Sequence, residues 1–180
     1  PRTAMTSNGL GLKHTAKALA EAGLDRVNIS LDTIDPATFA TITRRDRLAD
    51  VIDGLQAASD AGLAPVKVNA VLLRGINDAE SPDLLRWCIK QDYELRFIEQ
   101  MPLDAQHGWN REAMVTADET LTLLREHFTL APLGGRGSAP AEKFLVDDGP
   151  HTVGIIGSVT RPFCGDCNRV RLTADGQILN

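Results

Sequence analysis

Two stretches of this chain repeat one order of features: a helical segment, a glycine, and a short strand rich in β-branched residues. Gly23 precedes the strand expected at residues 26–32, and Gly62 precedes the strand expected at 65–71. A glycine just after a helix adopts the left-handed conformation that ends it. Strands that alternate with helices across short connections form parallel sheets. The repeat therefore predicts an α/β fold, either a barrel or a doubly wound sheet.

Polar and apolar side chains alternate in both of these strands. When the strands are aligned on their glycines, Lys67 matches Asn28 and Asn69 matches Ser30. Because strand side chains alternate between faces, one polar face then runs across neighbouring strands. A parallel sheet covered on both faces reads instead as continuous apolar runs. The polar face favours a partly open barrel whose interior meets ligand or water.

The helices carry start signals of their own. Asp35 and Ser81 each precede a proline, as an N-cap precedes a proline at the first helical position. Thr116 and Glu119 have the spacing of a capping box. One helix shows an apolar stripe made of Val51, Ile52, Leu55 and Ala58. Further strands are expected at residues 2–8, 93–101, 142–148 and 151–160, and a further helix from 81 to about 91.

The composition changes after residue 130. A glycine-rich stretch at 134–140 predicts a linker or loop tip, and the two strands beyond it predict an antiparallel addition. We therefore expect the C-terminal portion of a partial barrel at residues 1–130 and the start of a second domain at 131–180.

Charge and cysteine content exclude several functional classes. The net charge of −5 over 180 residues argues against a broad nucleic-acid interface. Three cysteines form no even disulfide framework, and no signal peptide or long apolar run is present, so we expect a cytoplasmic protein with no membrane contact. The chain begins with Pro1 inside an expected strand, and we interpret both ends as truncations.

Cys164 and Cys167 bring two thiolates within reach of one metal or of each other. A redox pair usually opens a helix, whereas the residues after this pair alternate like a strand, so a metal is favoured. His151 is a candidate further ligand of a zinc site. Arg169 and Arg171 either face solvent or bind phosphate groups, for which guanidinium groups are suited.

Lys67 stands out because burying an unpaired ammonium is costly. It must pair with an acid such as Asp32, bind an anion, or act as a Schiff-base amine. Thr6, at the end of the first strand, is either part of a plain turn or part of the ligand end of a barrel. On these grounds alone, Cys88 and Met101 are expected to be core residues.

A set of motifs appears in a fixed order along the chain. They are Thr6-Ser-Asn-Gly9, Val27-Asn-Ile-Ser-Leu-Asp32, Val66-Lys-Val-Asn69, Arg74-Gly-Ile-Asn-Asp78, Leu95-Arg-Phe-Ile-Glu-Gln-Met101 and Pro162-Phe-Cys-Gly-Asp-Cys167 with Arg169-Val-Arg171. With this ordered set the chain resembles the MoaA-type GTP 3′,8-cyclases, radical S-adenosylmethionine enzymes of molybdenum-cofactor biosynthesis.

The resemblance implies an incomplete triosephosphate-isomerase-type (β/α) barrel that holds two [4Fe–4S] clusters. One cluster reduces S-adenosylmethionine to give a 5′-deoxyadenosyl radical, which abstracts the ribose 3′ hydrogen of GTP. The resulting carbon radical closes onto guanine C8 to form 3′,8-cyclo-7,8-dihydroGTP. The downstream partner is cyclic pyranopterin monophosphate synthase, and the resemblance leaves a homodimer open.

The resemblance also implies roles for individual residues. Ser30 and Met101 match S-adenosylmethionine contacts, which replaces the core interpretation of Met101. The matches to GTP contacts are Thr6, Lys67, Arg169, Val170 and Arg171. Cys164 and Cys167 match two ligands of the second cluster. The family's Cys-x3-Cys-x2-Cys motif and its third ligand of the second cluster lie outside this chain, so we expect the chain alone to be inactive.

Two other functions stay open from the residues themselves. One is an aldolase-like barrel that uses Lys67 as a Schiff base. The other is a non-catalytic binding module whose cysteine pair holds zinc.

Overall fold

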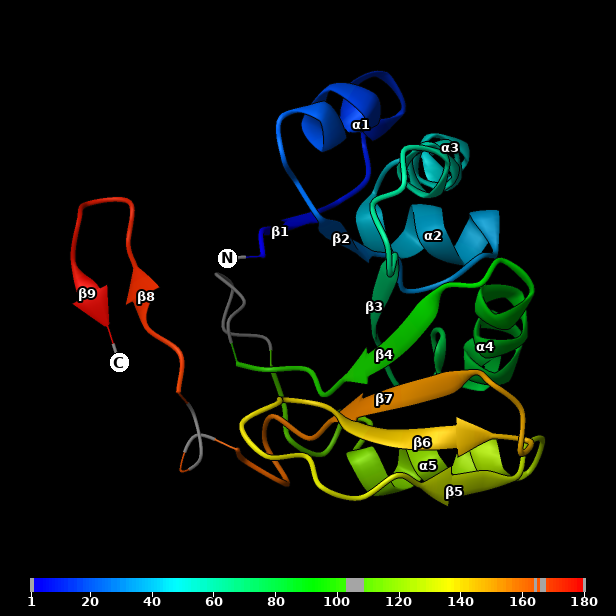
Figure 1. The fold of residues 1–180 in the computed structure, drawn as a ribbon. Helices are drawn as coiled ribbons and strands as arrows, with labels where there is room; N and C mark the ends of the chain where they lie inside the picture. The colour runs from blue at the N-terminus through cyan, green and yellow to red at the C-terminus, as the bar shows by residue number, and fades with distance from the viewer. Residues whose placement is uncertain (1, 103–108, 164, 166–167, 180) are drawn as a thin grey trace.

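The computed structural model describes residues 2–102, 109–163, 165 and 168–179. Within these residues seven strands form one sheet, in the order β1-β2-β3-β4-β7-β6-β5 (Figure 1). The bounds of these strands are β1 Ala4–Ser7, β2 Arg26–Ser30, β3 Lys67–Val71, β4 Glu94–Ile98, β5 Leu130–Pro132, β6 Glu142–Val146 and β7 Thr152–Ile156.

The sheet is parallel from β1 through β4 and on to β7, and it becomes antiparallel at β6 and β5. The predicted α/β class with a parallel sheet is confirmed, as is the antiparallel pairing of the strands after the glycine-rich stretch. A small hairpin of β8 (Arg171–Leu172) and β9 (Ile178–Leu179) stands apart from the sheet (Figure 1). The domain boundary expected near residue 130 stays a prediction.

Helices α1 to α4 cover one face of the sheet, and the β8–β9 hairpin lies on the other side (Figure 1). None of the helices in the described parts of the chain is long and apolar enough to cross a bilayer. The helical bounds are α1 Leu12–Glu21, α2 Pro36–Thr43, α3 Leu48–Asp60, η1 Asp78–Glu80, α4 Ser81–Lys90 and α5 Ala117–Arg125.

Most of the expected helix ends are confirmed. Asp35 accepts a hydrogen bond from the amide of Thr38 at 2.8 Å, and Thr116 opens α5 with a complete capping box. The predicted cap at Ser81 is wrong. The turn of η1 continues directly into α4, so Ser81 is already helical and its hydroxyl donates to the carbonyl of Asp78.

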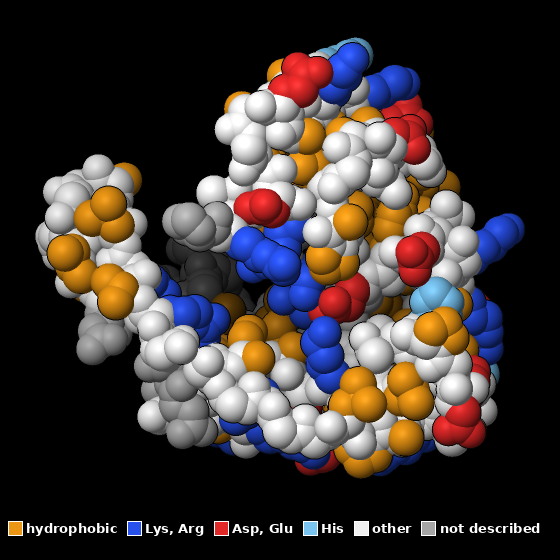
Figure 2. Space-filling view, viewed as in Figure 1, with side chains coloured by type: hydrophobic (Ala, Val, Ile, Leu, Met, Phe, Trp, Pro, Cys, Tyr) orange, Lys and Arg blue, Asp and Glu red, His pale blue; other side chains and the backbone are white. Residues whose placement is uncertain are grey.

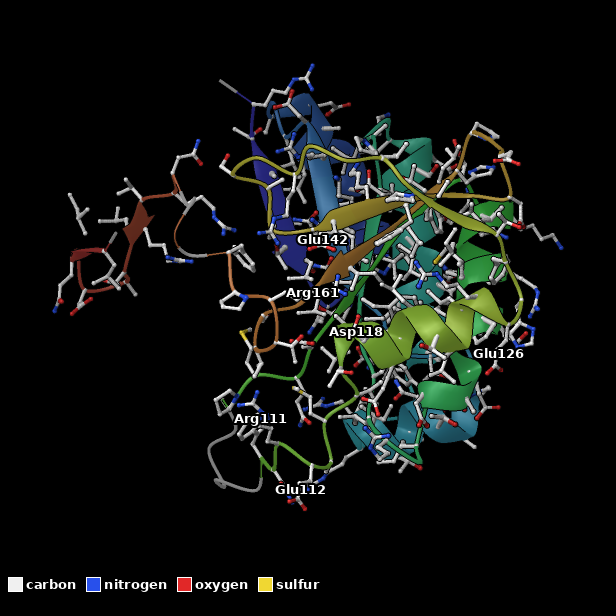
Figure 3. The ribbon with its side chains drawn as sticks, turned by 90° about the horizontal axis from the view of Figure 1, so that it is seen from below. Arg111, Glu112, Asp118, Glu126, Glu142 and Arg161 are labelled. Atoms are coloured by element: carbon white, nitrogen blue, oxygen red, sulfur yellow. The ribbon has the colours of Figure 1, made fainter. Side chains whose placement is uncertain are left out.

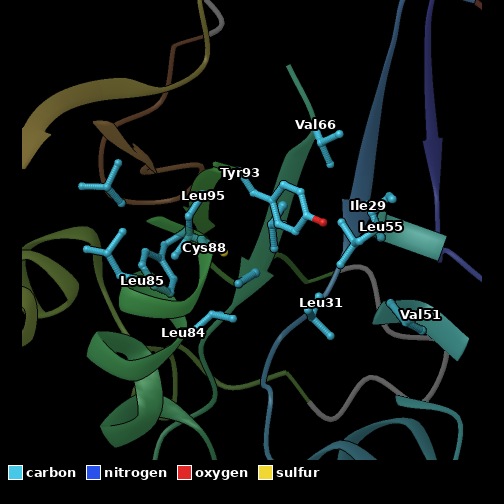
Figure 4. Packing of buried hydrophobic residues seen from close by; sticks show 14 of the residues in the cluster. Ile29, Leu31, Val51, Leu55, Val66, Leu84, Leu85, Cys88, Tyr93 and Leu95 are labelled. Atoms are coloured by element: carbon cyan, nitrogen blue, oxygen red, sulfur yellow. The ribbon is translucent and has the colours of Figure 1, made fainter. Parts of the chain in front are cut away.

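The core lies between the sheet and its helices (Figure 4). From β2 it takes Val27 and Ile29, both fully buried, and from α3 it takes Leu55. Cys88 of α4 is buried here as predicted, and burial raises the pKa of its thiol. This thiol is therefore a packing group, which leaves the other two cysteines of the chain for chemistry.

Candidate functional site

The face of the sheet opposite helices α1 to α4 is lined by polar side chains in register across the strands. The predicted match of Asn28 with Lys67 and of Ser30 with Asn69 is confirmed by the pairing of β2 with β3. One transverse row consists of Thr6, Asn28, Lys67 and Glu94, and the next consists of Ser30, Asn69, Arg96 and Gly154. We call these two rows, together with Lys143 opposite Gly154, the open face.

Lys67 pairs with a carboxylate, as one of the predicted alternatives required. The partner is Glu94 rather than Asp32: the Nζ of Lys67 donates to Glu94 Oε1 at 2.8 Å, and both side chains are less than a fifth exposed. Lys143 approaches the same oxygen to 3.3 Å. Burial by itself would raise the pKa of Glu94, but the two ammonium groups hold the pKa below its ordinary value. One carboxylate thus serves two cations.

Arg96 lies across the open face and is only partly satisfied there. Its Nη2 donates to Asn28 Oδ1 at 2.9 Å, and Asn28 in turn donates to Thr6 Oγ1 at 3.2 Å. The Nε of Arg96 and the Oδ1 of Asn69 are buried and have no hydrogen-bond partner among the residues that the structure describes. Buried polar atoms without partners are rare and costly, so they indicate a place where a polar ligand completes the bonding.

Gly154 makes room for this arginine. A Cβ at position 154 would lie 2.8 Å from Arg96 Cγ, closer than real Cβ contacts. A side chain at position 154 would force Arg96 to move from its present position. The absence of a side chain at this position therefore helps to place a cation on the open face.

A cavity of about 380 Å³ opens at the carboxyl ends of β1 and β2. Asn8, Ser30 and Asp32 contribute polar groups to its wall, and Phe39 contributes an aromatic ring. Burial raises the pKa of Asp32, although a hydrogen bond from the amide of Val71 opposes the shift. Ligands of parallel α/β sheets bind at this end of the strands.

Met101 follows β4 and is 43% exposed, so it is not a core residue. It is not among the residues that line the cavity at Ser30. Both residues nevertheless lie at or beyond the carboxyl ends of their strands, separated by β3 in the order of the sheet.

The segment that carries Arg169, Val170 and Arg171 lies on the open side of the sheet (Figure 1). The guanidinium group of Arg169 sits 5.1 Å from the centre of the Phe163 ring, whereas Val170 is 69% exposed. Figure 2 shows basic side chains gathered in the hollow between this segment and the sheet.

The two cysteines of the Cys-x-x-Cys motif, Cys164 and Cys167, lie outside the described residues. No group of three or more potential ligands for a metal ion is found among the residues that the structure does describe. His151 precedes β7, whereas the cysteines come after its end, and its Nδ1 is 3.8 Å from Asp92.

Sequence reasoning missed three charged residues of the open face. Glu94 and Arg96 alternate with Leu95 and Phe97, so the rule that had placed Lys67 would also have placed them. Lys143 gave no such signal, because its place depends on the antiparallel pairing of β6 with β7.

Two family models divide the chain between them. Residues 1–88 match the radical SAM superfamily, and residues 93–180 match the model described as Molybdenum Cofactor Synthesis C. The chain is 65% identical over 180 residues to the GTP 3′,8-cyclase of Streptomyces coelicolor, covering 99% of this chain and 53% of that protein. It is 57% identical over 183 residues to that of Mycobacterium marinum, covering 99% and 51%.

The chain thus spans about half the length of the curated relatives it matches. Among solved structures, a radical SAM methyltransferase from Sphaerobacter thermophilus aligns with a TM-score of 0.48 and 16% identity, covering 68% of this chain and 37% of that one.

Proposed function

Because this chain belongs to the family of MoaA-type GTP 3′,8-cyclases, we propose that its protein converts GTP to 3′,8-cyclo-7,8-dihydroGTP in molybdenum-cofactor biosynthesis. The observation that carries the proposal is the open face. Two of the expected GTP contacts, Thr6 and Lys67, lie there in one transverse row. Beside that row, Arg96 and Asn69 hold buried polar atoms that have no partner within the described parts of the chain.

The charge of the open face suits a triphosphate. Lys67, Lys143 and Arg96 supply three cations, whereas Glu94 supplies the carboxylate that contacts the two lysines. Cations in a hollow attract an anionic substrate even when the protein as a whole is acidic. In our proposal Thr6, Lys67 and Arg96 orient GTP from the sheet, and Arg169, Val170 and Arg171 close on it from the opposite side.

S-adenosylmethionine is assigned to the carboxyl edge of the sheet, with Ser30 and Met101 as contacts. The cavity beside Ser30 fits this assignment, because it combines an aromatic ring with hydroxyl, amide and carboxylate groups. When bound, S-adenosylmethionine and its iron–sulfur cluster supply the radical chemistry. The residues of this chain bind, orient and exclude water.

The cysteine pair is proposed to bind the second of two [4Fe–4S] clusters. Cys164 and Cys167 are the thiols that remain once Cys88 is buried in the core, and thiolates at this spacing suit such a cluster. A third ligand would come from outside this chain.

We propose the wider fold, the cellular location and the downstream partner from the resemblance to the family. The sheet would belong to a partial triosephosphate-isomerase-type barrel, with residues 1–130 in the barrel and 131–180 in a second domain. The protein would work in the cytoplasm, as a monomer or a homodimer, and pass its product to cyclic pyranopterin monophosphate synthase.

Two other functions predict different results. A Schiff-base enzyme would need Lys67 free to reach a substrate carbonyl, but its Nζ is held by Glu94 at 2.8 Å. Borohydride would trap a substrate on Lys67 if that function were correct. A zinc-holding module would give colourless protein with stoichiometric zinc and no iron after anaerobic preparation.

The deciding experiment substitutes Cys164→Ser in the natural full-length protein. We expect loss of the cyclised product with S-adenosylmethionine cleavage at least partly kept, because the first cluster is untouched. Cys88→Ala is the matched control, and it should keep both activities because that thiol is buried in the core. Equal loss of both activities in Cys164→Ser would contradict the role assigned to the pair.

A further inference from the structure

One buried carboxylate lies away from the open face. Glu99 follows β4, continues the parity of Leu95 and Phe97, and is only 4% exposed. Its Oε1 accepts from the amide of Ala117 at 2.7 Å and from the hydroxyl of Thr160. Its Oε2 accepts from the amides of Val159 and Thr160, both at 2.8 Å. A charge at an otherwise apolar position needs this many donors to be tolerated.

The four donors belong to two segments that are far apart in the sequence. Ala117 is the first residue of α5. The first amides of a helix have no acceptor within the helix, so they favour a nearby anion. Val159 and Thr160 follow β7 and stand a few residues before Cys164. The amide of Glu99 itself donates to the carbonyl of Ile156 at 3.1 Å. The end of β4, the start of α5 and the exit from β7 are thereby joined at one residue.

A second anchor holds the same exit from β7. Arg161 donates to Glu142 at 2.7 Å and also pairs with Asp118 of α5 (Figure 3). Its amide donates to the carbonyl of Gly157 at 3.0 Å. A Cβ at Gly157 would lie 2.8 Å from Arg161 Cβ, so the turn is tight enough to require glycine there. Residues 157–161 therefore form a fixed turn, which we call the exit turn.

We propose that Glu99 is a positioning residue for the cysteine pair: it fixes the exit turn, from which the chain runs directly to Cys164 and Cys167. The proposal rests on the proposed function, in which that pair binds the second cluster. The contacts that hold the turn come from residues of this chain, so we expect the turn to form without a bound metal. Cluster binding would then need less ordering of the chain, since the turn that precedes both thiols in the sequence is already formed.

Glutamine is the sharpest substitution for Glu99. It has the same shape, but one of the two carboxylate oxygens becomes an amide group that cannot accept from an N–H donor. Glu99→Gln should therefore release either the amides of Val159 and Thr160 or the donors on the other oxygen. Glu119→Gln is the matched control, because Glu119 also contacts the start of α5, through Thr116, but does not touch the exit turn.

Hydrogen exchange of the metal-free full-length protein tests the turn directly. In Glu99→Gln we expect the amides of Val159 and Thr160 to exchange at least about tenfold faster, or the amide of Ala117 to do so if the glutamine nitrogen takes the place of Oε1. In Glu119→Gln the amides of Val159 and Thr160 should exchange at the wild-type rate. After anaerobic reconstitution, iron content and electron paramagnetic resonance should show roughly 10- to 100-fold weaker binding of the second cluster, with the first cluster unchanged. Wild-type exchange together with a wild-type second cluster in Glu99→Gln would overturn the proposal.

Thr160 supplies a second pair of variants if Glu99→Gln does not fold. Thr160→Ser keeps the hydroxyl that donates to Glu99, and Thr160→Val removes it at nearly constant volume. Faster exchange of the exit turn and a weaker second cluster in the valine variant, with rescue by serine, support the proposal; identical behaviour of the two contradicts it. A wild-type protein that binds only one cluster would instead refute the proposed function, while the exchange data would still test the turn.

Discussion

The two faces of the sheet take alternate side chains from the same strands, yet their residues are bonded very differently. On the helix-covered face Val27, Ile29 and Val68 are fully buried in one continuous core. On the open face Lys67 pairs with Glu94 and Arg96 donates to Asn28, and two buried polar atoms there find no partner among the described residues. The first face gains free energy from burial alone. The second is held by hydrogen bonds and ion pairs, and in the described residues it keeps polar groups that could accept a ligand.

This difference indicates where stability and function reside. Substitutions on the covered face should act on folding, and those on the open face should act on substrate binding. The predictions below test that division, beginning with the largest expected effect.

Neighbouring residues of β2 give the most direct test. Ile29→Ala should lower the free energy of unfolding by about 2–5 kcal/mol, because it leaves a cavity in the core. Asn28→Ala, one position away on the open face, should cost under about 1.5 kcal/mol, since it removes hydrogen bonds to Thr6 and Arg96. Urea denaturation of both variants measures the difference. Equal losses would contradict the division between the faces.

Gly154→Ala should affect both stability and binding. The added Cβ would collide with Arg96, so we expect a cost of about 1–3 kcal/mol from overpacking and a higher KM for GTP. Gly149→Ala is the control, since its Cβ would make only ordinary contacts, and it should change stability by less than about 0.5 kcal/mol. An unchanged KM in Gly154→Ala would show that the position of Arg96 does not matter for substrate.

Glu94→Gln tests the shared carboxylate through pH. Because the folded protein holds the pKa of Glu94 below its ordinary value, this carboxylate contributes stability above that ordinary value, and the contribution is lost as pH falls through the folded pKa. We expect the variant to be about 1–2 kcal/mol less stable at pH 7, with the gap closing toward pH 3.

The same variant should bind GTP more tightly, since Lys67 and Lys143 lose their negative partner. Urea denaturation across pH and the KM for GTP measure the two effects. A stability gap that stays constant with pH would show that the ion pairs contribute nothing.

Thr6→Val should have the smallest effect. It removes the acceptor for Asn28 on an exposed strand where valine is well tolerated, so stability should change by less than about 1 kcal/mol. The KM for GTP should rise if Thr6 contacts the substrate. Thr3→Val lies on the same chain end but outside the rows of the open face, and it should leave the KM unchanged.

Much of the fold could be predicted because its signals are local. The glycines before the strands and the alternation within β2 and β3 depend on a few adjacent residues each, and the predicted register between Lys67 and Asn28 is correct. The cap at Ser81 was mispredicted because η1 adds a turn that the Ser-Pro signal does not reveal. The place of β7 between β4 and β6 is a long-range pairing with no local signal.

The site was predicted less completely for the same reason. Lys67 could be recognised from its own strand, but the identity of its partner depends on β4 lying next to β3. Alternation with Leu95 and Phe97 placed Glu99 on the apolar face, but its own sequence neighbours do not reveal what would satisfy a buried carboxylate there. Its role depends on the amides of Val159 and Thr160, some sixty residues later in the chain.

The first family match ends at residue 88, near the end of α4, and the second begins at residue 93, just before β4, so the line between them divides a continuous sheet. β4 belongs to the second match but pairs along its whole length with β3 of the first. Lys67 from one match and Glu94 from the other form a single ion pair. A different second half joined at this line would have to supply both a strand that pairs with β3 and a counter-ion for Lys67. The two matches therefore depend on each other structurally, and we expect neither to fold as well alone as within the whole sheet.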